Sequence, residues 1–287
     1  MSRQRLPVSD GGLILGVDFT SAPSKKKPIT VAVGRWMGNW PTPTYRLDEI
    51  RGLVSLRDYE TFLREDGPWL GGFDLPFGQP RSLIEHERWP RHWPAFVEFY
   101  CSQPRVALRD TFRRWCDASP AGDKFAWRKA GKPAGSSPAM RWTNPPVAWM
   151  MHAGIGRMLE AGLVFPAHGH GSAGSHDRIA LEAYPGFTAR KVCRTSYKSD
   201  SAARQTPERS ANRQAILQAL VRGAAGLDIR LEIEPAWTRR LLDDGSGDPL
   251  DAVICGLQAG HAAALETYGF PDDLDPLEGW IAAVPPG

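Results

Sequence analysis

The hydrophobic pattern predicts buried strands in the first third of the chain and again after its middle. Short apolar runs bounded by turn residues are typical of strands that lie inside a sheet. The β-branched run at 29–33 follows a basic turn, and we expect it to pair as a hairpin with the run at 13–19. The predicted strands are at 13–19, 29–33, 44–47 or 49–54, 69–78 and 179–185.

Helices are predicted where a capping residue precedes a helical stretch and a stop signal follows it. Asn144 can cap one helix that begins at Pro145 and ends before Gly162, and the pair Asp248-Pro249 opens the last helix. The predicted helices are at 56–64, 94–101, 107–116, 145–160, 207–222 and 248–265. Residues 119–146 have the glycine and proline content of a loop.

The chain is expected to form one domain. Its 287 residues contain no internal repeat and no clear linker. The stretch between the fourth and fifth predicted strands is much longer than an ordinary connection. We therefore interpret residues 79–175 as an insertion within a single domain of residues 1–287.

Composition excludes several classes of protein. A hydrophobic share of 42% and a charged share of 23% are typical of a globular chain and exclude collagen, a long coiled coil and wholesale disorder. No run approaches the ~18–20 apolar residues that span a bilayer, and residues 1–12 lack the apolar segment of a secretion signal. The four cysteines form no C-x-x-C pair. We therefore expect a cytoplasmic protein with reduced thiols and no membrane partner.

Charge is distributed unevenly along the chain, although the net charge is only +3. Residues 81–141 hold twelve Lys/Arg against six Asp/Glu, and residues 186–213 hold seven against two. Residues 228–287 hold three against twelve. A basic middle and an acidic C-terminal part would suit an anionic substrate held near carboxylates, although a solvated surface of mixed charge explains the same pattern.

Acidic residues recur singly inside the predicted strands. Asp18, Asp74 and Glu182 each lie in one apolar run, and Asp248 and Asp251 open the last predicted helix. A lone carboxylate in a buried strand is costly unless it is paired or binds a metal. If these carboxylates converge, Mg²⁺ or Mn²⁺ would relieve their repulsion, because hard divalent cations prefer oxygen ligands. Such ions can activate water for phosphodiester cleavage.

Each strand acid also has a purely structural explanation. Asp18 and Asp74 precede residues that are typical of turns, and their side chains can hold a turn by hydrogen bonds. Glu182 can pair with Arg178 or Arg190 at a sheet edge.

The two helix acids differ in this respect. Asp248 is well suited to cap a helix whose first residue is Pro249, so capping alone can explain it. Asp251 lies beside an apolar stripe and is therefore the better candidate for a ligand.

Five short stretches carry a resemblance to a known family. They are 16–22 (GVDFTSA), 72–78 (GFDLPFG), 137–138 with 145–147, 181–185 (LEAYP) and 248–252 (DPLDA). In order and spacing the chain resembles domain of unknown function 429, a family of predicted nucleases with a ribonuclease H-like fold. The resemblance implies an α/β fold with a mixed five-stranded sheet, the first three strands antiparallel, and helices on both faces. A large helical and loop insertion would separate the fourth and fifth strands.

The same resemblance implies roles for the acids. Asp18 would be the metal-binding acid of the first strand, and Asp74 the acid that follows the fourth. Asp248 and Asp251 would be contributed by the last helix as further metal ligands. Glu182 matches an acid of a later strand, so Asp18, Asp74, Glu182 and Asp251 are the candidate catalytic residues.

Two basic sets are candidates for contacts with substrate phosphates. Arg109 and Arg113 are four residues apart and would share one face of a helix, and guanidinium groups suit phosphate oxygens. Lys191 and Lys198, with Arg194 between them, follow Glu182. The first set is equally compatible with an ordinary surface helix, and the second with local neutralisation of acids.

Three hypotheses for the function follow. The first is a metal-dependent nuclease that hydrolyses phosphodiester bonds of DNA or RNA at a Mg²⁺ or Mn²⁺ centre held by carboxylates. The second is a non-catalytic nucleic-acid-binding or protein-binding domain that keeps the same fold. The third is an actin-like ATP phosphotransferase, which is disfavoured because the chain has no paired glycine-rich phosphate loops.

Overall fold

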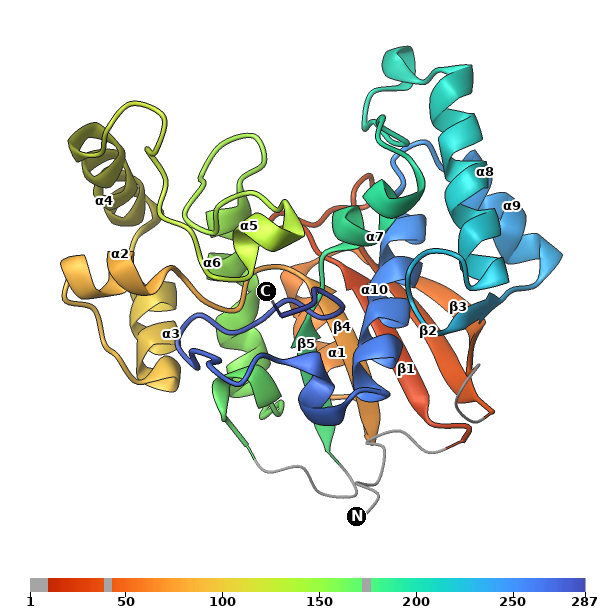
Figure 1. Cartoon of the computed structure of the whole chain (residues 1–287), viewed down its shortest axis with the longest axis horizontal. Coiled ribbons are helices and arrows are strands. Elements are labelled where there is room, and N and C mark those ends of the chain that lie inside the picture. Colours follow the sequence, from red (N-terminus) through yellow and green to blue (C-terminus); the bar gives the residue numbers. More distant parts are fainter. Residues whose placement is uncertain (1–9, 39–42, 172–176, 287) are drawn as a thin grey trace.

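A six-stranded sheet forms the centre of the computed structural model, which describes residues 10–38, 43–171 and 177–286. The strand order is β5-β4-β1-β2-β3-β6. Helices cover both faces of this sheet (Figure 1). The strands are β1 (Leu13–Asp18), β2 (Ile29–Met37), β3 (Thr44–Leu53), β4 (Trp69–Asp74), β5 (Arg178–Glu182) and β6 (Arg230–Glu232).

The sheet is mixed. Strands β1, β2 and β3 are antiparallel neighbours, whereas β1 with β4, β4 with β5, and β3 with β6 are parallel. The predicted β1–β2 hairpin is thus confirmed, and the third strand is one continuous element rather than either of the two short ranges. The structure has six described strands instead of the expected five, because β6 adds to the free edge of β3. This strand has three residues, too few for a hydrophobic pattern to reveal.

Alternate side chains of the strands feed two separate cores. Leu15 and Val17 of β1 face a core formed with α1, α3 and α6. Ile14 of the same strand faces the other core, formed with α8, α9 and α10. The molecule therefore has three layers, with the sheet in the middle.

All six predicted helices are present, with ends that differ by a few residues. Thr206 caps α8 by accepting a hydrogen bond from the backbone N–H of Arg209. The predicted cap Asn144 is wrong, because Pro146 precedes α6 and no side chain caps that helix. Among the described helices, none is long and apolar enough to cross a membrane.

Four shorter α-helices and three 3-10 turns were not predicted. The predicted helices are α1 (Leu56–Leu63), α3 (Trp93–Ser102), α4 (Arg105–Ala118), α6 (Val147–Glu160), α8 (Pro207–Arg222) and α10 (Asp248–Ala263). The additional ones are α2 (Arg81–His86), α5 (Gly131–Ala134), α7 (Pro185–Val192), α9 (Pro235–Asp243), η1 (Pro166–His168), η2 (Ala202–Arg204) and η3 (Glu266–Gly269).

The insertion between β4 and β5 contains α2 to α6 and extends to one side of the sheet, opposite α8 and α9 (Figure 1). Its apolar side chains share one core with α1 and the sheet, so the described part of 79–175 does not form a separate unit. Residues 172–175 lie outside the described residues. The C-terminal segment holds the insertion in place: the backbone N–H groups of Arg81 and Lys129 donate to the carboxylate of Glu278 at 2.8 and 2.7 Å.

Helix α10 lies unusually close to β1 and β4. Gly16 and Gly72 face it, and a Cβ atom at these positions would overlap the backbone carbonyl oxygens of Ala252 and Cys255. The helix is buried along nearly its whole length. This contact places the beginning of α10 at the carboxyl ends of β1 and β4, on the upper edge of the sheet in Figure 1.

Replacement of Gly16 by alanine should therefore destabilise the protein. The added methyl group forces α10 away from β1, and overpacking of this kind costs about 1–3 kcal/mol or more in the free energy of unfolding. Gly52→Ala is the matched control, because its Cβ would lie 3.3 Å from the ring of Pro28 and meet no backbone atom. Urea denaturation of both variants measures the difference, and equal stabilities would contradict a tight α10 contact.

His168 gives the fold a predictable dependence on pH. Its Nδ1–H donates to the carbonyl oxygen of Pro276 at 2.7 Å, its ring stacks on Trp93, and its Nε2 has no partner among the described residues. Burial lowers the pKa of His168 from 6.5 to about 3, against the effect of the Pro276 hydrogen bond. The unfolded chain thus binds this proton more readily.

The contribution of His168 to the free energy of unfolding should be fully present above about pH 6.5. It should be lost as the pH falls toward 3, by at most about 1.4 kcal/mol per pH unit. We expect His168→Gln to flatten this part of the stability profile measured by urea denaturation. Substitution of the exposed His86 by Gln serves as the control and should leave the profile unchanged. A His168→Gln profile that still follows the parent in this range would refute the assignment.

Candidate functional site

Asp18 and Asp74 lie side by side at the ends of two parallel strands. Each is the last residue of its strand, and the two are direct partners in the register of β1 and β4. Because direct partners in neighbouring strands point to the same face, both carboxylates lie on the face that α10 covers. The predicted proximity of these two acids is thus present in the structure.

Helix α10 brings two further acids to the same place. Asp251 lies in its first turn and is fully buried, and Asp248 is its first residue. The cap of the helix is Gly247, whose φ of 77° suits glycine, and Asp248 makes no capping hydrogen bond. The prediction that Asp248 caps the helix is therefore wrong by one position. The four acids Asp18, Asp74, Asp248 and Asp251 are called the carboxylate cluster below.

Lys198 and Tyr197 hold Asp251 from the loop that precedes α8. The Tyr197 hydroxyl donates to Oδ1 of Asp251, and the Lys198 ammonium donates to Oδ2. Tyr197 is itself fixed, because the Arg213 guanidinium donates to its backbone carbonyl oxygen at 2.8 Å. Asp251 is thus the best-satisfied acid of the cluster.

The acids at the strand ends resist ionisation. Burial raises the pKa of Asp74 to about 7, and the negative charges of Asp251, Glu182 and Asp248 add to this effect against the opposing Lys198 ammonium. Burial likewise raises the pKa of Asp18 well above its usual range, again against Lys198 and with help from Asp251. Burial is thus the main cause of both shifts, and the neighbouring carboxylates add to it.

Lys198 responds in the opposite way. Burial alone would lower the pKa of its ammonium, but the charge of Asp251 and the nearby Tyr197 and Asp18 raise it well above its usual range. Lys198 is therefore charged at neutral pH. It is the cation that partly compensates the carboxylate cluster.

The carboxylate oxygens of the cluster are chemically suited to bind a hard divalent cation. In the described part of the chain, no donor is bound to the carboxylates of Asp18, Asp74 or Asp248. Oxygen donors with mutual repulsion are what Mg²⁺ and Mn²⁺ bind in proteins. The geometry is not yet that of a coordination shell, since the described residues contain no group of three or more His, Cys, Asp or Glu placed to hold a metal ion.

Glu182 forms an ion pair with a different residue from the two that the sequence suggested. It is the last residue of β5, and both of its carboxylate oxygens bind the buried guanidinium of Arg128, one of them at 2.7 Å. The backbone N–H of Phe77 donates to it at 2.9 Å. The expected partners point elsewhere, because Arg178 donates to the carbonyl oxygens of Leu63 and Ala161. Glu182 thus joins the insertion to the sheet beside Asp74, and its catalytic role stays a prediction.

Arg190, the other expected partner of Glu182, donates instead to the carbonyl oxygen of Ala134. Lys191 lies over the ring of Phe187 at 4.3 Å and faces Gly226 rather than the acids. Of the basic residues that follow Glu182, only Lys198 is in contact with a member of the carboxylate cluster among the described residues.

The helix with Arg109 and Arg113 lies away from the cluster. Arg109 forms an exposed ion pair with Asp110 at 3.0 Å. Helix α4 is at the outer end of the insertion, far from β1 and α10 in Figure 1. Contacts of these two arginines with phosphate remain a prediction.

Two residues of the site escaped the sequence analysis. Tyr197 precedes a lysine in a polar loop and carries no periodic signal, and Arg128 lies in the stretch that was expected to be only loop. The local composition shows neither contact, because each partner lies more than fifty residues away in sequence.

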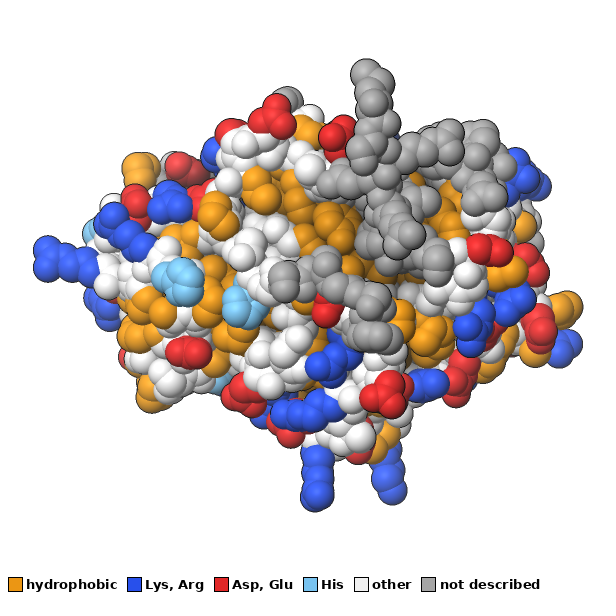
Figure 2. Space-filling model, turned by 90° about the horizontal axis from the view of Figure 1, so that it is seen from below, with side chains coloured by type: hydrophobic (Ala, Val, Ile, Leu, Met, Phe, Trp, Pro, Cys, Tyr) orange, Lys and Arg blue, Asp and Glu red, His pale blue; other side chains and the backbone are white. Residues whose placement is uncertain are grey.

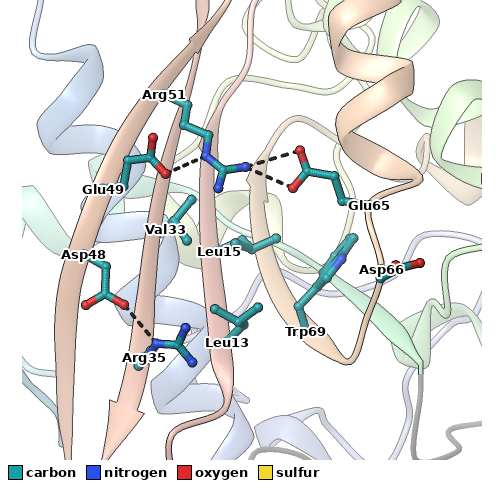
Figure 3. Close-up of a pocket in the computed structure, with 10 residues that line it drawn as sticks. All are labelled: Leu13, Leu15, Val33, Arg35, Asp48, Glu49, Arg51, Glu65, Asp66 and Trp69. Atoms are coloured by element: carbon teal, nitrogen blue, oxygen red, sulfur yellow. Dashed lines mark hydrogen bonds and ion pairs between the residues drawn. The ribbon is translucent and has the colours of Figure 1, made fainter.

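A hollow of about 270 Å³ lies elsewhere on the sheet and is a weaker candidate (Figure 3). Its floor is apolar, and its charged rim is already paired: Arg35 binds Asp48 at 3.0 Å, and Arg51 binds Glu49 and Glu65 at 2.8 and 2.9 Å. It begins at Leu13, the opposite end of β1 from Asp18. Ten residues line it: Leu13, Leu15, Val33, Arg35, Asp48, Glu49, Arg51, Glu65, Asp66 and Trp69.

Comparison with known proteins adds no neighbour to this picture. No protein-family model matches the chain, and neither curated proteins nor solved structures match it. The carboxylate cluster is therefore the feature of the molecule that bears on its function.

Substitution of Asp74 by Asn should stabilise the protein when divalent metal is removed with EDTA. A carboxyl whose pKa is raised from 3.8 to about 7 contributes stability at low pH that is lost as the pH rises through 7. At pH 8 we expect Asp74→Asn to raise the free energy of unfolding by roughly 1–3 kcal/mol, and the gain should vanish toward pH 4. Asp123→Asn on the exposed surface should change neither value. A destabilised Asp74→Asn protein at pH 8 would contradict the crowding of charges.

Proposed function

We propose that this chain is a metal-dependent nuclease of the ribonuclease H-like superfamily, related to domain of unknown function 429. The observation that carries the proposal is the convergence of Asp18, Asp74 and Asp251 from two strands and a helix onto one face. The strand arrangement supports it: three antiparallel strands are followed by two that run parallel to the first, in the order β5-β4-β1-β2-β3.

Asp18 and Asp74 are the residues that would hold a Mg²⁺ or Mn²⁺ ion, with Asp248 and Asp251 completing its ligands. A divalent ion at this place supplies a Lewis acid that lowers the pKa of water and offsets the charge of a phosphate group. The chain contributes a negative, partly buried setting that favours the cation. The strand pairing fixes the backbone positions of Asp18 and Asp74 relative to each other.

Basic residues near the cluster would hold the nucleic acid backbone. The turn Lys25-Lys26-Lys27 follows β1, and Lys27 reaches Asp200 of the Lys198 loop at 2.6 Å, so both basic segments lie at this edge of the sheet. The opposite end of the molecule shows Lys/Arg and Asp/Glu side chains intermixed (Figure 2). We expect a polyanion to approach the edge that carries the carboxylate cluster through these lysines.

One observation favours the alternative of a nucleic-acid-binding domain without catalysis. Lys198 already occupies Oδ2 of Asp251, and the described residues include no preformed metal-binding group. A domain of this kind would bind nucleic acid through the same basic edge but would not cleave it.

The first experiment is cleavage of labelled single-stranded and double-stranded DNA and RNA with Mg²⁺ or Mn²⁺. Asp18→Asn keeps the shape of the side chain but removes the charge that a metal ligand needs. We expect it to fold and to lose about 100-fold or more of the activity. Asp123→Asn controls for the change in net charge and should retain full activity.

The result decides between the two functions. A parent protein that cleaves no substrate but binds nucleic acid with an affinity that falls steeply with salt would favour the binding domain. An Asp18→Asn variant as active as the parent would exclude Asp18 as an essential ligand.

A further inference from the structure

The two partners of Asp251 differ in how firmly they are held. Tyr197 is 8% exposed, and its backbone is anchored by Arg213. The Lys198 side chain is 39% exposed, although its ammonium reaches the fully buried Asp251. Oδ1 of Asp251 is therefore held by a fixed donor, and Oδ2 by a donor whose stem is open to solvent.

The positive charge of the Lys198 ammonium acts on the whole carboxylate cluster. Lys198 is the main opposing positive charge for Asp18 and Asp74, and it acts on Asp248 after Lys27. The second cation near these acids, Lys27, is largely engaged with Asp200 at 2.6 Å in an exposed pair. The Lys198 ammonium contacts Oδ2 of the fully buried Asp251 and therefore occupies a position that a divalent ion bound to this oxygen would need.

We propose that the Lys198 ammonium is the resident cation of the metal-free carboxylate cluster, and that a divalent ion displaces it from Oδ2 of Asp251. This inference rests on the proposed function for its biological meaning but not for its test. Two cations cannot share Oδ2 at contact distance without strong repulsion. The exposed stem of Lys198 gives the ammonium a path into solvent, while Tyr197 keeps Asp251 oriented.

Exchange of the Lys198 ammonium for a divalent ion at Asp251 would also free Lys198 to bind substrate. Once released, an ammonium at the edge of the cluster is placed to bind the phosphate of a nucleic acid, for which lysine acts as a point charge. Lys198 would then link the two events, because it leaves Asp251 when the metal arrives and becomes available to the substrate. In this scheme it is a positioning and binding residue.

The first test measures binding of Mn²⁺ alone by isothermal titration calorimetry on the full chain. Removal of the competing cation in Lys198→Met should lower the Kd for Mn²⁺ by about tenfold, which corresponds to about 1.4 kcal/mol. Lys124→Met is the matched control, because it removes one positive charge from an exposed loop position of the insertion. Its Kd should equal that of the parent.

A second test uses the parent protein, so it does not depend on folding of the variant. The rate at which an amine-reactive reagent labels Lys198 is followed by mass spectrometry with and without Mn²⁺. Release from Asp251 should raise this rate several-fold, whereas labelling of Lys124 should stay constant. The proposal would be overturned if Lys198→Met bound Mn²⁺ no more tightly than the parent. It would also be overturned if Mn²⁺ did not increase the labelling of Lys198.

The outcomes of these two tests can be distinguished from the outcome of the test for nuclease activity. Competition between Mn²⁺ and Lys198 in a protein that cleaves no nucleic acid would support the exchange and refute the nuclease. Cleavage that depends on metal without any effect of Lys198 on Mn²⁺ affinity would support the nuclease and refute the exchange. Failure of both parent and Lys198→Met to bind Mn²⁺ would overturn the exchange.

Discussion

The close contact of α10 with β1 and β4 is the constraint on which the candidate site depends. Gly16 and Gly72 leave no side chain between the strands and the backbone of the helix. The helix can therefore approach until its first turn stands at the ends of both strands. A larger residue at either position would move Asp251 away from Asp18 and Asp74, so the packing of the core and the assembly of the site are the same event.

The contact of α10 with β1 and β4 brings together carboxylates that repel one another. Folding removes water from carboxylates that repel one another, and this raises the pKa values of Asp18 and Asp74. Lys198 and Tyr197 offset this repulsion most directly at Asp251, to which both donate hydrogen bonds. A fold that keeps an unfavourable arrangement at one edge, while its two cores are well packed, has the character of a functional site rather than of a structural one.

The insertion and the C-terminal segment support the same edge from outside. Arg128 reaches Glu182 at the end of β5, and Glu278 binds backbone groups of Arg81 and Lys129. The ion pair of Arg128 and Glu182 is fully desolvated, so loss of either partner would leave a buried charge without compensation. Through this pair the insertion is fixed next to Asp74, beside the candidate site.

Local patterns in the sequence determined the strands β1, β2 and β4 and the longer helices, because apolar runs and helix start and stop signals act over a few positions. They also marked Asp18, Asp74 and Asp251, since an isolated acid in an apolar segment stands out. Only the tertiary structure decided which charges meet. Arg128 and Glu182 are 54 residues apart, and Lys198 and Asp251 are 53 apart. Ion pairs of this kind depend on how the layers dock, and one-dimensional periodicity carries no information about that docking.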